Sequence, residues 1–123
     1  KPVRDGHYVA WSYTHWLART DNTGQVKNPI ARRVIDLIVG EKVTPAPAFD
    51  PTLVQIHSHF VPVCAMHVKR DFEGGDLSLF KHPEPCDCFF DSQTGTPGAT
   101  CSICTDDSTC GTGKCRHNFC EPR

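Results

Sequence analysis

The sequence predicts a small α/β or α+β fold with two short helices and a few strands, followed by a disulfide-rich, irregular C-terminal module. The chain has 123 residues, enough for one domain or part of a larger one. Apolar residues make up 38%, below the ~45–50% usual in globular chains. All eight cysteines lie in residues 64–123. We therefore expect a packed segment, residues 1–70, and a Cys-rich tail, residues 71–123.

The first predicted element is a short strand at residues 8–11 that passes into a helical turn. Val9, Trp11 and Tyr13 alternate as side chains of a strand do, although the same stretch also fits a helix face. Residues 20–25 are polar and contain a glycine, which indicates a turn.

A helix is predicted over residues 29–39. Asn28 can cap its N-terminus, and Pro29 suits the first helical position, where no N–H is needed. Gly40 can adopt the left-handed conformation that ends a helix. The apolar residues recur at helical spacing and are Ile30, Val34, Leu37 and Ile38.

A second helix is expected after Asp50 and Pro51, which repeat the combination of a cap and a proline. Its apolar face would comprise Leu53, His57 and Phe60. Residues 60–70 alternate as a strand would, with Pro62 confining the start of that strand to a sheet edge. From residue 81 onward no periodicity survives, so we expect an irregular tail.

The cysteines favour disulfides over metal or redox chemistry. Structural zinc usually needs a second CxxC or a histidine pair, and only Cys101 and Cys104 form a CxxC. A redox CxxC should open a helix, which this tail does not suggest, and haem attachment needs a histidine where Thr105 stands. The predicted disulfide set is Cys64, Cys86, Cys88, Cys101, Cys104, Cys110, Cys115 and Cys120.

The pairing is open, but geometry constrains it. Cys64 lies on the predicted strand, so a bond from it to Cys86 or Cys88 would join the tail to the packed segment. Cys86 and Cys88 should not pair with each other, because a one-residue loop is strained. The remaining six cysteines would then form three bonds. Such a set predicts an oxidising location: extracellular, periplasmic or at the cell surface.

Among the seven histidines, His57, His59 and His67 are the candidate ligands of a copper or zinc ion. If this stretch is extended, the first two share a face and the third keeps their parity. The alternative is that they are ordinary surface or partly buried side chains. No motif for a catalytic nucleophile, a phosphate loop or a metalloprotease is present, so we expect neither an enzyme nor a cofactor.

Charge and hydropathy exclude two further classes. Basic and acidic side chains number 13 and 14, giving a net charge of −1, and aromatic residues are not interleaved with the basic ones. Nucleic-acid binding therefore has no support. No apolar run approaches the ~18 residues of a membrane span.

Residues 3–40 resemble a segment near the C-terminus of phosphate-type periplasmic substrate-binding proteins. The matching element comprises Asp5, Gly6, Tyr8 and Trp11, followed by the helix at residues 29–39; Val9 stands where that family usually has a proline. The tail resembles the Cys-rich ends of some secreted bacterial proteins. The resemblance implies that this chain is the end of a two-lobed α/β protein that binds an oxyanion between its lobes.

The resulting hypothesis is a non-catalytic, extracytoplasmic component similar to a binding protein. Tyr8, Trp11 and Trp16 would pack against a partner, either another chain or an N-terminal part of the same protein. Two alternatives remain open: a structural or adhesive cell-surface module that works through its Cys-rich tail, and an extracellular metal-binding protein.

Overall fold

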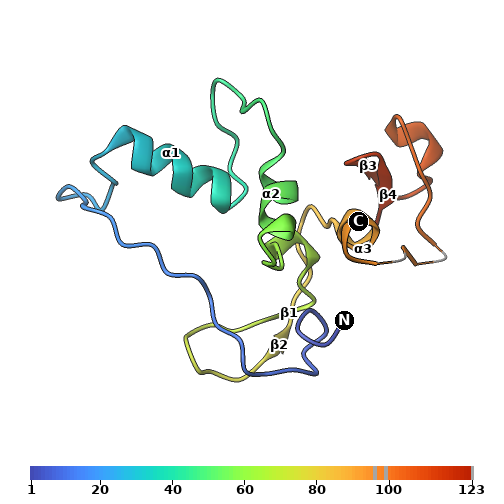
Figure 1. Ribbon diagram of the computed structural model, residues 1–123, viewed down its shortest axis with the longest axis horizontal. Coiled ribbons are helices and arrows are strands. Elements are labelled where there is room, and N and C mark those ends of the chain that lie inside the picture. The colour runs from blue at the N-terminus through green and yellow to red at the C-terminus, as the bar shows by residue number, and fades with distance from the viewer. Residues whose placement is uncertain (96, 99, 123) are drawn as a thin grey trace.

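The computed structural model describes residues 1–95, 97–98 and 100–122. Its helices are α1 (Pro29–Ile38), α2 (Pro51–His57) and α3 (Asp87–Thr94), with 3₁₀ turns at Val63–Ala65 and Asp107–Thr109. The strands form two antiparallel pairs, β1 (Val68–Lys69) with β2 (Ser78–Leu79), and β3 (Lys114–Arg116) with β4 (Phe119–Glu121). Figure 1 shows α1 and α3 toward opposite ends of the molecule, with α2 between them. The predicted small, mixed and disulfide-rich fold is confirmed.

The hydrophobic core lies between α2, the first 3₁₀ turn and α3. Its buried residues are Ile56, Ala65, Cys86, Phe89 and Phe90, and Leu53, Val61, Cys64 and Phe119 pack against them. These residues come from both sides of the boundary predicted at residues 70 and 71. The Cys-rich half therefore supplies a large share of the apolar interior.

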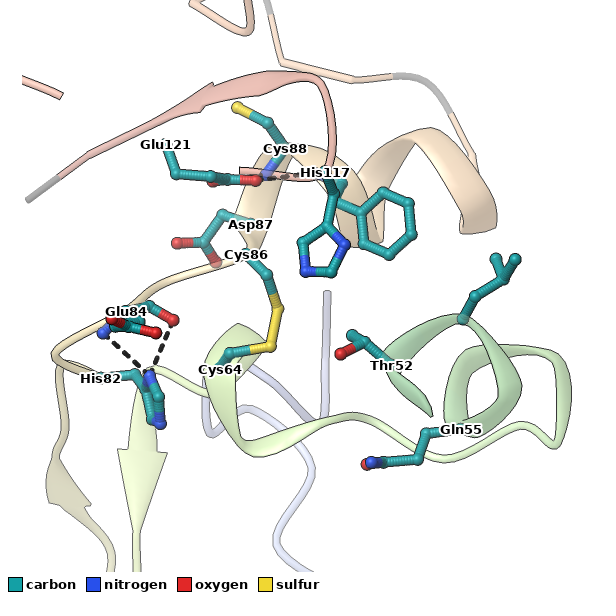
Figure 2. Close-up of a disulfide and its surroundings, with 12 residues drawn as sticks. Thr52, Gln55, Cys64, His82, Glu84, Cys86, Asp87, Cys88, His117 and Glu121 are labelled. Carbon is teal, nitrogen blue, oxygen red and sulfur yellow. Dashed lines mark hydrogen bonds between the residues drawn. A yellow bond between two sulfur atoms is a disulfide. The ribbon is translucent and has the colours of Figure 1, made fainter. Parts of the chain in front are cut away.

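The expected irregular tail is wrong at residues 87–94, which form α3. Its N-cap residue, Cys86, makes no capping hydrogen bond with its side chain within the described part of the chain. Instead, the Glu121 carboxylate accepts hydrogen bonds from the backbone N–H groups of Cys88 (3.0 Å) and Phe89 (2.9 Å). Glu121 is fully buried, so β4 provides the cap that the local sequence lacks. Figure 2 shows this carboxylate beside Cys88.

All eight cysteines are paired. Cys64 bonds Cys86, one of the two partners that the sequence allowed, and this bond joins the 3₁₀ turn to the start of α3. The remaining pairs are Cys88–Cys101, Cys104–Cys115 and Cys110–Cys120. Cys86 thus bonds a residue that precedes α3, and Cys88 bonds a residue that follows it. These two disulfides attach the start of α3 to chain segments on both sides of the helix.

Helices α1 and α2 begin where the sequence predicts, but α2 ends at His57, so Phe60 does not belong to the predicted helical face. The Asn28 side chain accepts from the N–H groups of Ile30 (2.9 Å) and Ala31 (3.1 Å), and Gly40 follows the helix at a φ of 86°. Asp50 caps α2 through the N–H groups of Thr52 and Leu53, at 2.8 and 3.2 Å.

The strand predicted over residues 60–70 is wrong for most of its length. Pro62 leads into the 3₁₀ turn, where Ala65 and Met66 donate to carbonyls three residues back. Only β1 remains, because β2 offers just two residues for pairing. The strand predicted at residues 8–11 is also absent from the described structure, since this stretch has no strand beside it.

We expect Glu121→Ala to destabilise the fold by about 1–3 kcal/mol, because it leaves two buried N–H groups without an acceptor. The free energy of unfolding in urea, measured with disulfides intact, checks this. Glu84→Ala is the matched control, since the Glu84 side chain is 67% exposed and should change stability by less than about 0.5 kcal/mol. Equal effects of the two substitutions would contradict the capping role.

Burial raises the pKa of the Glu121 carboxyl, and this effect outweighs the hydrogen bonds from Phe89 and Cys88 that lower it. Because the folded pKa exceeds the unfolded one, the protonated group favours folding. Its contribution is full below the ordinary value of 4.5 and falls as pH rises through the folded pKa. The stability of wild type relative to Glu121→Gln, whose amide does not titrate, should therefore fall as pH rises from about 4.5 through the folded pKa. Thermal unfolding of both proteins across that range measures the difference, and an increase would refute the burial argument.

Candidate functional site

A cleft of about 190 Å³ lies beside the Cys64–Cys86 disulfide. It is formed by the end of α1, by α2, by the segment before α3 and by the β3–β4 turn. Figure 2 shows Thr52, His82 and His117 around this disulfide. The polar side chains that line the cleft are those of Thr52, Gln55, His82, Glu84, Arg116 and His117.

Helix α2 supplies one wall of the cleft. Its cap, Asp50, fixes the first turn and thereby places Thr52. One turn later, Gln55 donates through Nε2 to the carbonyl of Ile38 at 3.1 Å, which joins α2 to the end of α1. This wall therefore combines a hydroxyl with an amide that is already engaged.

The opposite wall comes from the turn between β3 and β4. His117 and Asn118 have φ values of 48° and 65°, and two successive positive values identify a two-residue turn that suits a tight hairpin. The His117 ring stacks on Phe89, with centroids 4.3 Å apart and planes at 10°. Its Nδ1 lies 2.8 Å from Oδ2 of Asp50. The turn is thereby held against both α3 and α2.

Arg116 is the one Lys or Arg side chain among the described residues that line the cleft, and its guanidinium is not fully hydrogen-bonded. Its side chain is 23% exposed, and its Nη1 is buried without a hydrogen-bond partner among the described residues. Nη2 lies 3.9 Å from the Glu84 carboxylate, beyond hydrogen-bonding distance. Nδ1 of His82 lies 2.7 Å from the Glu84 carbonyl oxygen, which holds that ring at the rim. The cleft thus offers donors to an anion.

The structure does not bring the three candidate metal-binding histidines together. His57 ends α2, and His59 follows it in a left-handed conformation with a φ of 64°. Among the described residues, the one group of His, Cys, Asp and Glu with metal-ligand spacing contains only cysteine sulfurs, and all of these are in disulfides. Such sulfurs are not thiolates and do not form a zinc site.

His67 instead forms part of an ionic cluster. Its ring nitrogens lie 2.8 Å from Asp5 and 2.7 Å from Asp87, and Arg4 lies 3.1 Å from Asp91. Burial raises the pKa of the Asp5 carboxyl, but the hydrogen bond from the α-amino group of Lys1 and the charge of Arg4 lower it overall to about 2. The cluster attaches the first residues to α3.

The predicted partner-packing residues lie on the surface. Tyr8 and Trp16 are about half exposed, at 52% and 53%. Trp11 is half-buried; its ring meets Tyr13 edge-on at 5.4 Å, and the Arg70 guanidinium lies over it at 5.1 Å. The three side chains share one segment, but the rest of the chain covers them only in part.

The residues of the cleft are not predicted by the sequence. Thr52 and Arg116 are separated by 64 positions, and neither belongs to a recognisable motif. One local signal was available: a His-Asn pair lies between two short runs that each contain a cysteine, a pattern compatible with a tight hairpin.

Scans against protein-family models, curated proteins and solved structures find no match for this chain.

Proposed function

We propose that this protein is a non-catalytic, extracytoplasmic component of a binding protein, and that residues 8–38 attach it to an α/β lobe. The observation that carries the proposal is the unburied apolar surface of this segment. A helix in a globular protein normally buries its apolar face against another element.

In α1 the polar face is engaged, whereas the apolar face is covered only toward the C-terminal end of the helix, where Leu37 and Ile38 are partly buried. Arg32 pairs with Asp36 at 2.9 Å, one helical turn away. All ten residues of α1 are described, and none of them is buried. Ile30 is 73% exposed and Val34 is 40% exposed. Exposed apolar side chains at this spacing form a stripe that suits packing on another element.

The segment that leads to α1 has the same character. Residues 9–18 form no helix or strand, and among the described residues their backbone makes no hydrogen bond to another backbone segment, although the Val9 carbonyl accepts a hydrogen bond from the Arg70 guanidinium. Leu17 is 99% exposed. Figure 1 shows this stretch as a long blue arc between the N-terminal loop and α1.

These features indicate what kind of partner fits. An extended segment with unpaired backbone groups can add to the edge of a sheet, and the helix that follows can then cover the face of that sheet. An α/β lobe with an open sheet edge offers both contacts. The resemblance of residues 3–40 to substrate-binding proteins supports the same partner, with solute bound by the complete protein.

Location outside the cytoplasm is supported by the disulfides. Four of them in a chain of this size are typical of oxidising compartments and rare in the cytosol. None of the helices in the described residues is long and apolar enough to span a bilayer.

The proposal can be tested by comparing this chain with a longer polypeptide that includes whatever native sequence precedes it in its gene. In the longer protein, amide hydrogen exchange of residues 8–38 should slow at least tenfold, and the emission of Trp11 and Trp16 should shift to the blue. Ile30→Asp should reverse the protection in α1, because it places a charge in the apolar contact. Arg32→Asp, on the polar face, is the matched control.

Three outcomes would overturn the proposal, and the first two concern the longer polypeptide. The first is unchanged exchange in residues 8–38 of the longer polypeptide, and the second is the absence of any preceding coding sequence. The third is a stable dimer of the chain alone that protects the same residues, since the surface would then serve a second copy.

A further inference from the structure

The geometry points to a binding site for a small oxyanion in the cleft beside the Cys64–Cys86 disulfide. This site is built entirely from the described part of the chain. Of the residues that line it, only Ile38 at the end of α1 belongs to residues 8–38, and the polar side chains come from elsewhere, so the site stands or falls separately from the proposed function.

Arg116 lines the cleft and has donors to spare. A guanidinium carries five N–H donors, and buried donors without partners are costly. Here Nη1 is buried and unpaired among the described residues, and the nearest carboxylate, that of Glu84, is 3.9 Å from Nη2. A buried unpaired donor in a native structure calls for an acceptor, either water or an ion. An oxyanion matches the guanidinium geometry, because it can accept two parallel hydrogen bonds.

The walls of the cleft also favour an anion, because they present a free hydroxyl and only one carboxylate among the described lining residues. The Thr52 side chain lines the cleft, and its hydroxyl makes no hydrogen bond within the described structure, so it is available to donate. Glu84 contributes the one carboxylate among the described lining residues, and its side chain is 67% exposed, which leaves it free to remain in water. Asp50 does not compete either, because its carboxylate is committed to the cap of α2 and to His117.

The volume of the cleft suits a small ion. Sites for drug-sized ligands measure roughly 300–1,000 Å³. A cleft of about 190 Å³ is smaller and fits a tetrahedral ion with some of its water. The Cys64–Cys86 bond and the β3–β4 turn keep the walls in place without a ligand. The site is therefore preformed, which reduces the entropic cost of binding.

The test is a titration of the full oxidised chain with sodium sulfate, followed by ¹H–¹⁵N correlation spectra at constant ionic strength. We expect saturable shifts at the amides of Thr52, Gln55 and His117 and at Nε of Arg116. Parallel titrations with phosphate and acetate distinguish a tetrahedral ion from a carboxylate. Sodium chloride alone should produce no saturable change at these positions.

Substitutions then locate the site. Arg116→Gln should weaken sulfate binding at least about tenfold, because it removes a charge-assisted donor pair. Thr52→Val, which keeps the shape of the side chain, should weaken it about threefold to tenfold. Lys114→Gln is the matched control: it removes the same charge from the same strand, but Lys114 pairs with Asp107 and does not line the cleft. It should change the affinity by less than about twofold.

Linear shifts without saturation, or equal weakening by Arg116→Gln and Lys114→Gln, would overturn the assignment. Saturation by acetate but not by sulfate or phosphate would also overturn the tetrahedral ligand. If the spectrum of Arg116→Gln shows a disturbed fold, Thr52→Val decides the question, since it leaves the backbone of α2 and its cap unchanged.

Discussion

The bond between Cys64 and Cys86 is the constraint on which the rest of the structure depends. It joins the 3₁₀ turn after α2 to Cys86, the N-cap residue of α3, across 22 positions of sequence. Closing a loop of this length removes about 3 kcal/mol of conformational entropy from the unfolded chain. The aromatic residues Phe89 and Phe90 follow directly, and they complete the core against Ile56. Without this bond, the small core would have to hold α3 unaided.

Polar contacts join α3 and the core around it to segments nearer each end of the chain. Toward the C-terminus, Glu121 caps α3, and His117 joins the hairpin to Asp50. Toward the N-terminus, His67 lies within hydrogen-bonding distance of Asp5 and Asp87, and Arg4 pairs with Asp91, so polar contacts hold the first residues. The molecule is thus well connected around α3 and sparsely connected around α1. The two proposals follow that division: a preformed cleft in the connected part, and an attachment surface in the sparse part.

Local signals predicted α1 and α2 well, because Asn28, Asp50 and the prolines after them act within one helical turn. The even number of cysteines likewise indicated disulfides. By contrast, α3 was missed because its cap, Glu121, lies 33 positions from Cys88. The strand predicted over residues 60–70 failed for a related reason: alternation describes which faces can be buried, but it does not supply a neighbouring strand. The cleft was not predictable either, since folding alone brings Thr52 and Arg116 to one place.

Covalent cross-links in one particular pattern shape the second half of this protein. Proteolysis of the native, unreduced protein at acidic pH, followed by mass spectrometry of the linked peptides, tests this pattern most directly. We expect four linked pairs: Cys64–Cys86, Cys88–Cys101, Cys104–Cys115 and Cys110–Cys120. Free thiols throughout the tail, or a peptide that joins Cys64 to any cysteine other than Cys86, would contradict this pattern.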